Sequence, residues 1–177
     1  MYTNSVVLFL AEKDFDEQEF LVIKKNLVNN KFNVFICSDS NSVCIGNNGL
    51  KVKNDIILPN LKHANFAVII IIGGKGIVNY FNNSQLISSI KDFNKNKKII
   101  AAICAAPIII AKSGILEGKS AACNINYKKE LEKEAVIFSS DNIVETKNII
   151  TAQNSIDSTI FISKTIMAIQ AANSKKY

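Results

Sequence analysis

Cys104 is the residue with the clearest chemical potential, in the segment Lys98-Ile-Ile-Ala-Ala-Ile-Cys-Ala-Ala-Pro107. The apolar, β-favouring run before Cys104 and the apolar run after Pro107 predict a strand that turns sharply into a helix. Ala105 and Ala106 are small enough for a tight turn, and proline suits the first turn of a helix. A thiol at that point faces the positive end of the helix dipole, which favours the thiolate. The alternative is a buried structural cysteine, because free cysteines are often buried.

An acid and a pair of glycines are candidate partners of this thiol. Glu19, in the first turn of a predicted helix, can share a proton with the thiolate or bind an oxidised sulfur if burial keeps it protonated. Gly73 and Gly74 allow a turn with free N–H groups, which together with the N–H of Ala105 can form an oxyanion hole. Each also has a structural alternative, because first-turn acids complement the helix dipole and glycines end strands.

The remaining candidates have less support. Cys123 ends a short predicted strand. If it lies close to Cys104, it can act as a resolving thiol or replace a catalytic side chain. The alternative is that it is a small apolar residue of the core. A Cys–His dyad needs an imidazole beside the sulfur, but we expect His63, the only histidine, at the opposite edge of the sheet. Three further residues are assigned to helix, packing or loop positions: Glu17, Cys37 and Cys44.

Composition excludes several classes of function. The chain has 177 residues, 48% of them hydrophobic, which suits a single α/β domain over residues 1–177. It contains no arginine, the residue that most often reads DNA bases, and its lysines are scattered, so we expect no sequence-specific nucleic-acid partner. The four cysteines form no CxxC pair, and Gly73-Gly-Lys-Gly76 is not a P-loop, so we expect no metal and no cofactor.

The apolar segments are short. The longest run, residues 66–72, cannot span a bilayer, and the N-terminus has the pattern of a strand rather than of a signal peptide. We therefore expect a cytoplasmic protein that makes no contact with a membrane.

Predicted strands and helices alternate along the chain. We expect strands over residues 5–11, 32–37, 66–72, 98–103, 120–123 and 148–152, with short β pieces at 43–45, 50–53, 136–139 and 143–145. We expect helices over residues 16–29, 83–94, 107–112, 127–134 and 156–172, the last capped by Ser155 or Asn154. This alternation indicates a parallel sheet covered on both faces.

The predicted topology brings the candidates together. In an open parallel sheet, ligands bind beyond the carboxyl ends of the strands. Four features directly follow strands: the acidic helix start with Glu17 and Glu19, the Gly73-Gly74 turn, Cys104 and Gln153-Asn154-Ser155. We expect all four at one edge, which favours a functional site over a buried structural cysteine.

Taken together, these residues resemble the ThiJ/PfpI superfamily, especially its parkinsonism-linked branch of cysteine sensors and reported deglycases. The resemblance covers nearly the whole chain. Its motifs are Phe15-Asp-Glu-Gln-Glu-Phe20, Ile71-Ile-Gly-Gly74, the segment around Cys104, Lys112-Ser-Gly-Ile-Leu-Glu-Gly-Lys119 and Ile150-Thr-Ala-Gln-Asn-Ser155. It implies a flavodoxin-like three-layer α/β/α sandwich with a mostly parallel central sheet, a strand–Cys–helix nucleophile elbow and a homodimer.

The resemblance also implies roles for individual residues. Cys104 becomes the elbow cysteine and Glu19 its carboxyl partner, with an oxyanion hole from Gly73, Gly74 and Ala105. The chain departs from the family at histidine. The protease-like branch has histidine directly after the cysteine, where this chain has Ala105, and the glyoxalase and deglycase branch has histidine after the elbow helix, where this chain has Cys123.

Two functional hypotheses follow. The first is a non-proteolytic cysteine protein whose Cys104 responds to oxidants or small electrophiles. The second is a cofactor-free glyoxalase or deglycase, a hydro-lyase or hydrolase acting on methylglyoxal or its adducts, in which Cys104 attacks the aldehyde and Glu19 shuttles protons. Missing histidines argue against peptidase and amidotransferase activity. A chaperone function or a role in thiamine biosynthesis has no supporting residue.

Overall fold

The central element is a seven-stranded sheet. The computed structural model describes residues 4–39 and 43–174, and the sheet has the strand order β11-β12-β8-β7-β1-β3-β6. Its strands are β1 (Ser5–Phe9), β3 (Asn33–Ser38), β6 (Ile56–Ile57), β7 (Val68–Ile71), β8 (Ile99–Ile103), β11 (Ile143–Thr146) and β12 (Ile149–Ala152). Every neighbouring pair is parallel except β11 with β12, so most strands end at one edge.

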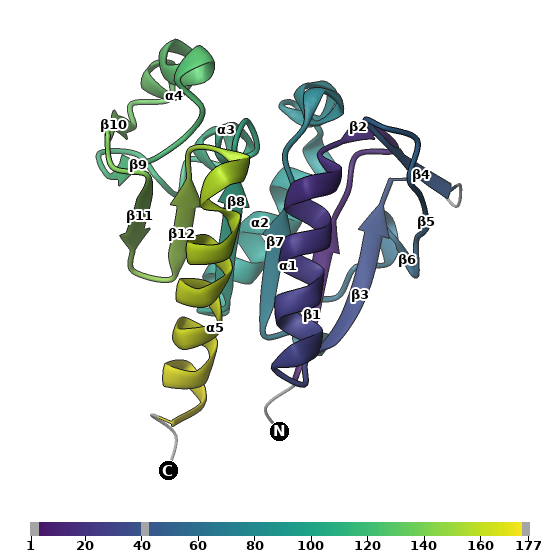
Figure 1. The fold of residues 1–177 in the computed structure, drawn as a ribbon. Coiled ribbons are helices and arrows are strands. Elements are labelled where there is room, and N and C mark those ends of the chain that lie inside the picture. The colour runs from purple at the N-terminus through teal and green to yellow at the C-terminus, as the bar shows by residue number, and fades with distance from the viewer. Residues whose placement is uncertain (1–3, 40–42, 175–177) are drawn as a thin grey trace.

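Helices lie on both faces of this sheet (Figure 1). They are α1 (Glu17–Asn29), α2 (Ser84–Lys95), α3 (Pro107–Lys112), α4 (Lys128–Lys133) and α5 (Ser158–Ser174). Two small sheets flank the main one: β2 (Lys13–Phe15) with β4 (Val43–Gly46) and β5 (Lys51–Lys53), and β9 (Ser120–Ala121) with β10 (Ile137–Phe138).

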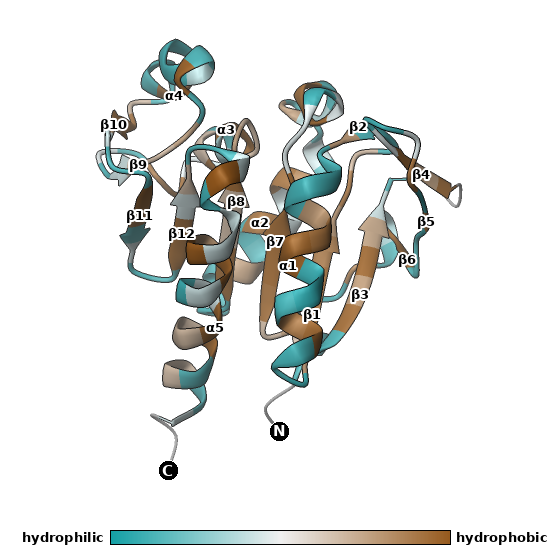
Figure 2. Cartoon of the chain, in the orientation of Figure 1, coloured by the Kyte–Doolittle hydropathy of each residue, from teal (hydrophilic) through white to brown (hydrophobic). Residues whose placement is uncertain are grey.

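Alternating side chains of the strands build two cores. In β7, Val68 and Ile70 pack on the side of α1 and α5, whereas Ile69 and Ile71 pack on the side of α2 and α3. All four are fully buried, as a strand covered on both faces requires, and the central strands are brown in Figure 2. The sheet is therefore a rigid platform for whatever lies at its carboxyl edge.

The observed elements follow the predicted order with local differences. The strand expected over 120–123 ends at Ala121, because the chain turns there toward the end of β8. The short edge strand β6 carries no sequence signal. The expected cap of the last helix was wrong: no side chain caps the 3₁₀ turn that precedes α5, and the Ser155 hydroxyl instead bonds to acids at the start of α1.

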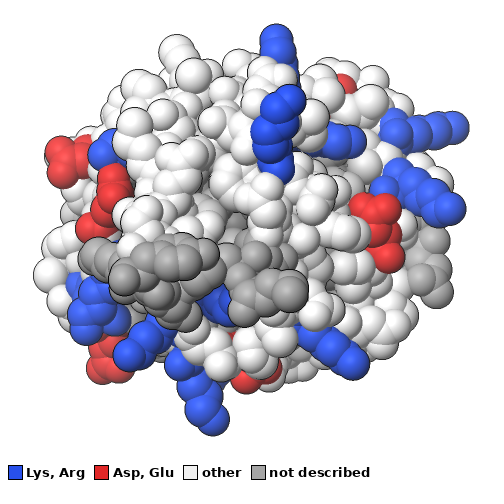
Figure 3. All heavy atoms as spheres, turned by 90° about the horizontal axis from the view of Figure 1, so that it is seen from below, with Lys and Arg blue, Asp and Glu red and all other residues white. Residues whose placement is uncertain are grey.

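The opposite end of the molecule holds both chain termini (Figure 1) and is seen directly in Figure 3. Lysine side chains are distributed around this face, with acidic residues standing among them. In the described parts of the chain, no helix combines the length and the apolar character that a membrane span needs.

Candidate functional site

Cys104 occupies the turn between β8 and α3. Its φ of 63° lies in the left-handed region, which a residue with a Cβ adopts only at a cost of about 1–2 kcal/mol. The backbone holds it there from both sides: its N–H donates to the carbonyl of Ala152 at 3.0 Å, and its carbonyl accepts from the N–H of Asn124 at 2.9 Å. Ala105 and Ala106 are buried, and Pro107 begins α3, so the turn has no room for larger side chains.

Glu19 reaches the same edge from the first turn of α1. Helix α1 begins there because Oδ1 of Asp16 accepts the N–H of Glu19 at 2.9 Å, an N-cap bond. The side chain of Glu19 is fully buried. Its Oε2 accepts the N–H of Gly73 at 2.7 Å. The Ser155 hydroxyl lies 2.8 Å from Oε1 of Glu19 and 3.1 Å from Oδ2 of Asp16, so two carboxyl groups share its single proton.

Gly73 separates the cysteine from the glutamate. A Cβ at Gly73 would lie 2.7 Å from Cβ of Cys104 and 2.8 Å from Oε2 of Glu19. Any larger residue would therefore push the two apart. The next residue, Gly74, has a φ of 110° and approaches the carbonyl of Asp14 so closely that a Cβ there would lie 2.4 Å from it.

Two backbone donors face the sulfur. The N–H groups of Ala105 and Gly74 lie near enough to the Cys104 sulfur to lower the pKa of its thiol, whereas the N–H of Gly73 donates to Glu19. The structure thus brings Cys104, Glu19 and all three proposed oxyanion-hole residues together, and divides the three donors between the thiol and the acid.

The electrostatics of the site differ from what the local motif indicated. Burial raises the pKa of Glu19 to about 8, and the nearby charge of Asp16 adds to this rise. Burial also raises the pKa of Cys104 to about 12, the charge of Glu19 adds to it, and the two N–H donors oppose it. The helix end was expected to favour the thiolate, but the pKa of Cys104 is raised, and burial is the largest cause. At neutral pH both groups carry their protons.

A pocket of about 500 Å³ opens onto Cys104. Most of the residues that line it have polar side chains, and the full lining is Asp14, Asp16, Asn47, Gly74, Lys75, Cys104, Ala105, Asn124, Asn126 and Tyr127. Tyr127 stacks edge-on against Phe81, with 5.6 Å between ring centroids. No sequence pattern marked Asn124, Asn126 or Tyr127, because they reach the pocket through tertiary packing.

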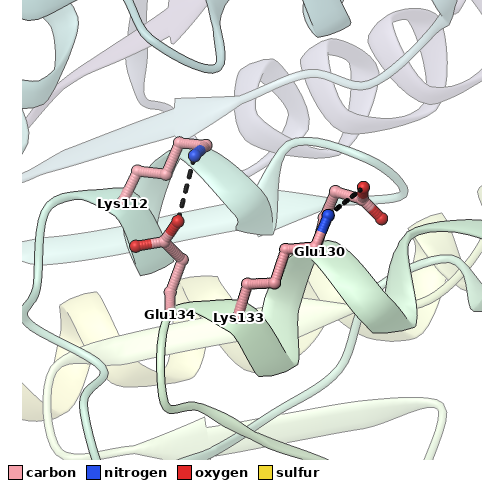
Figure 4. A network of polar contacts seen from close by, with 4 residues as sticks. All are labelled: Lys112, Glu130, Lys133 and Glu134. Carbon is pink, nitrogen blue, oxygen red and sulfur yellow. Dashed lines mark hydrogen bonds and ion pairs between the residues drawn. The ribbon is translucent and has the colours of Figure 1, made fainter.

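Helix α4 supports this wall of the pocket. Nζ of Lys112, at the end of α3, lies 3.0 Å from Oε1 of Glu134, just beyond the end of α4 (Figure 4). A second pair, Lys133 with Glu130 at 3.2 Å, lies on α4 itself. Partly exposed pairs of this kind contribute about 0–1 kcal/mol, and of these two only Lys112–Glu134 joins the end of α4 to α3. Helix α4 directly follows residues 125–127, which include the pocket residue Tyr127.

Cys123 lies beside Cys104. It is fully buried, and its sulfur donates to the carbonyl of Asn124 at 3.4 Å. Burial raises the pKa of Cys123 to about 12, and the charge of Cys104 is the second cause of that rise.

Other sequence candidates lie elsewhere. Oε1 of Glu17 accepts the N–H groups of Asn48 and Leu50 at 2.7 and 2.8 Å, so this acid holds the β4–β5 hairpin. His63 precedes β7, at the amino edge of the sheet, with its ring 6.4 Å from that of Phe93. Cys37 and Cys44 are buried near each other, away from the pocket lining. Within residues 4–39 and 43–174, no three His, Cys, Asp or Glu side chains gather as metal ligands would.

Comparison with known proteins places this geometry among similar folds. The model of the DJ-1/PfpI family matches residues 4–168. A ThiJ/PfpI domain protein from Brachyspira murdochii superposes with a TM-score of 0.94 at 21% identity, covering 97% of this chain and 99% of that one. Drosophila melanogaster DJ-1beta superposes with a TM-score of 0.82 at 21% identity, covering 98% and 97%. The expected flavodoxin-like fold is confirmed.

Two sequence relatives are 25–29% identical to this chain. An uncharacterised protein of Methanocaldococcus jannaschii is 29% identical over 176 residues, which cover 98% of this chain and 86% of that protein. A Caenorhabditis elegans protein described as a glutathione-independent glyoxalase is 25% identical over 150 residues, covering 85% of this chain and 80% of that protein.

Proposed function

The chain belongs to the DJ-1/PfpI family, and from this premise we propose that it is a non-proteolytic cysteine protein whose Cys104 responds to oxidants or small electrophiles. The observation that carries the proposal is the pairing of Cys104 with a buried Glu19 whose pKa is raised to about 8. A carboxylic acid that keeps its proton at neutral pH is a hydrogen-bond donor rather than a repelling charge.

The chemistry suits an oxidised sulfur. A hydroperoxide transfers one oxygen to the Cys104 thiol, its O–O bond breaks, and an alcohol or water leaves, so that a sulfenic acid forms. Further oxidation gives a sulfinate. The oxygens of either product find donors in the Glu19 carboxylic acid and in the N–H groups of Gly74 and Ala105. The anionic product is stabilised without a bound metal or cofactor.

The missing imidazole supports a non-proteolytic function. His63 is the single histidine of the chain, and it lies at the opposite edge of the sheet from Cys104. A cysteine peptidase or amidotransferase needs an imidazole against the sulfur to take up its proton. Buried Cys123 cannot replace it in that role, because its own pKa is raised to about 12.

Limited peroxide treatment tests this proposal, with free thiols read at each cysteine by mass spectrometry. We expect the Cys104 thiol to be lost before those of Cys37 and Cys44, and we expect Glu19→Ala to abolish this preference. Glu17→Ala is the matched control, because Glu17 lies in the same helical turn but bonds to the hairpin. Equal oxidation of Cys104, Cys37 and Cys44 in the wild-type protein would overturn the proposal.

A glutathione-independent glyoxalase or deglycase is the second candidate. The relative described as such a glyoxalase favours it, as does the pKa of Glu19, which lies close to neutrality and suits proton transfer. In this mechanism Cys104 adds to the aldehyde of methylglyoxal, and Glu19 moves a proton between the adjacent carbons to give lactate. Lactate formation without glutathione, lost in Cys104→Ser, would support it; no turnover by clean protein would end it.

We also propose a homodimer through the outer sides of α1 and α5. These helices pack side by side, and apolar residues appear on the sides facing the viewer in Figure 2. The exposed apolar residues of these helices are Leu21, Val28, Ile160 and Met167, and Ile156, in the turn before α5, is 84% exposed. Light scattering should give twice the monomer mass, and Ile160→Lys should reduce it to that of the monomer. All four cysteines are free, which suits a reducing compartment such as the cytoplasm.

A further inference from the structure

We infer that Cys123 is a resolving thiol, so that oxidation of Cys104 ends in a reversible Cys104–Cys123 disulfide. This inference rests on the proposed function, because it starts from a Cys104 that reacts with hydroperoxide. It adds what happens next: the chain itself provides the second thiol that returns the site to the reduced state through exchange with an external dithiol.

A backbone hydrogen bond joins the two segments that carry the cysteines. The N–H of Asn124 donates to the carbonyl of Cys104 at 2.9 Å. The segment that contains Cys123 therefore runs beside the Cys104 turn at the spacing of hydrogen-bonded strands, about 4.8 Å. Disulfides join residues whose Cα atoms lie about 4.4–6.8 Å apart. A spacing of about 4.8 Å between neighbouring segments falls within this range.

The two side chains also share one packing environment. Cys123 belongs to the core on the α2 and α3 side of the sheet, and Cys104 packs against that same core. The charge of Cys104 raises the pKa of Cys123, which places the two sulfurs within electrostatic reach. Cys37 and Cys44 show no such coupling to Cys104.

The two thiols differ in their access to solvent. Cys104 lines the pocket, whereas Cys123 is fully buried and absent from the pocket lining. A hydroperoxide arriving from solvent therefore meets Cys104 first. Cys123 lies behind it, sheltered from direct oxidation but next to the sulfur that becomes oxidised.

The chemistry balances in two steps. The hydroperoxide oxidises the Cys104 thiol by two electrons to a sulfenic acid, and its O–O bond breaks to release an alcohol or water. The Cys123 sulfur then attacks the Cys104 sulfur, the S–O bond breaks, and the hydroxyl leaves with the Cys123 proton as water. Reduction by a dithiol restores both thiols.

Peptide mapping without reduction tests the inference on the full chain. After limited hydrogen peroxide, we expect an intact mass lower by about 2 Da in samples whose thiols are not blocked, and dithiothreitol should reverse this change. In samples with blocked thiols, Cys37 and Cys44 should carry the label, whereas Cys104 and Cys123 should not. Trypsin should release a disulfide-linked pair of peptides, residues 99–112 joined to residues 120–128. In Cys123→Ser the disulfide is absent, and we expect about tenfold more sulfinic acid at Cys104, because no thiol intercepts the sulfenic acid.

Cys44→Ser is the matched control and should form the disulfide as the wild-type protein does. Because a substitution at buried Cys123 can impair folding, the linked peptides of the wild-type protein decide the matter by themselves. Sulfinic acid at Cys104 with a free Cys123 in wild-type protein would overturn the inference and leave the proposed function intact. Failure of Cys104 to react ahead of Cys37 would overturn both.

Discussion

The carboxyl ends of β3 and β8 each carry a cysteine with an acid close by, yet the two regions differ in what surrounds the sulfur. Cys37 lies near the charge of Asp39, and Cys104 lies near Glu19. Burial raises the pKa of both thiols to about 12. A raised pKa is therefore common to both regions and does not distinguish a functional thiol from a structural one.

The hydrogen-bond partners of the sulfur make the difference. Cys37 lies within its strand, and its thiol points its proton at the carbonyl of Ser38, 3.9 Å away. Cys104 lies one residue beyond its strand, where the N–H groups of Gly74 and Ala105 reach its sulfur and a pocket opens beside it. The first environment favours only the thiol, whereas the second also accommodates a negatively charged, oxygen-bearing product.

The largest expected effect is on the pH dependence of stability, and it comes from Glu19, the acid beside Cys104. Its pKa rises from 4.5 to about 8 on folding. Between these values the folded protein keeps a proton that the unfolded chain releases, so stability falls as pH rises, by up to about 1.4 kcal/mol per pH unit. Urea unfolding across this range should show the fall in wild-type protein and a flatter profile in Glu19→Gln.

Ser155→Ala should change the pKa of Glu19 without removing its carboxyl group. The Ser155 hydroxyl lowers the pKa of Glu19, so its removal should extend the fall in stability to higher pH. In the unfolded chain the thiols titrate around their ordinary pKa of 9.0, so the slopes are compared below pH 8, where the thiols contribute little. Parallel stability profiles for wild-type protein and Glu19→Gln would refute the assignment of a protonated Glu19.

The second prediction concerns the glycines of the two regions. Gly73→Ala forces a Cβ between Cys104 and Glu19, which should cost about 1–3 kcal/mol of unfolding free energy and abolish the peroxide preference of Cys104. Gly46, beside Cys44, is the matched control, because a Cβ there meets the side chain of Glu17 instead. Gly46→Ala should loosen the hairpin and preserve the preference. Equal loss of preference in both variants would contradict this account.

The sequence predicted the position of the site better than its chemistry. Glu19, Gly73 and Cys104 are distant in the chain, but all follow strands that end at one edge of a parallel sheet, so topology alone brings them together. The family resemblance and the flavodoxin-like fold are confirmed. The proton on Cys104 could not be predicted, because the local motif shows a helix start whereas burial depends on the whole fold.

The roles of Ser155 and Tyr127 depend on tertiary contacts that the sequence does not show. Ser155 has the residue type and position of a helix cap, but its hydroxyl turns to Asp16 and Glu19, more than a hundred residues earlier in the chain. Tyr127 reaches the pocket through packing against Phe81. Periodicity describes how a segment packs against its own layer, and it carries no information on such partners across layers.

The smallest expected effect is on the alkylation rate of Cys104. It distinguishes the charge of Glu19 from solvent access to the sulfur. Above pH 8 the wild-type Glu19 is ionised and its charge raises the pKa of Cys104. Glu19→Gln removes the charge, so iodoacetamide should alkylate Cys104 faster above pH 8, by up to about tenfold for each unit by which the pKa falls. Below pH 8 the rates should match, because Glu19 is then neutral in both proteins.

Cys37 in the same samples is the internal reference, because Glu19 is not among the charges that act on it. Its alkylation should stay unchanged, so the ratio of the two rates reports the Cys104 region alone. Acceleration of Cys104 at every pH would mean that the substitution widens the pocket rather than removes a charge. That outcome would contradict an electrostatic role for Glu19. The Cys37 and Cys104 regions would then differ only in how accessible their sulfurs are to solvent.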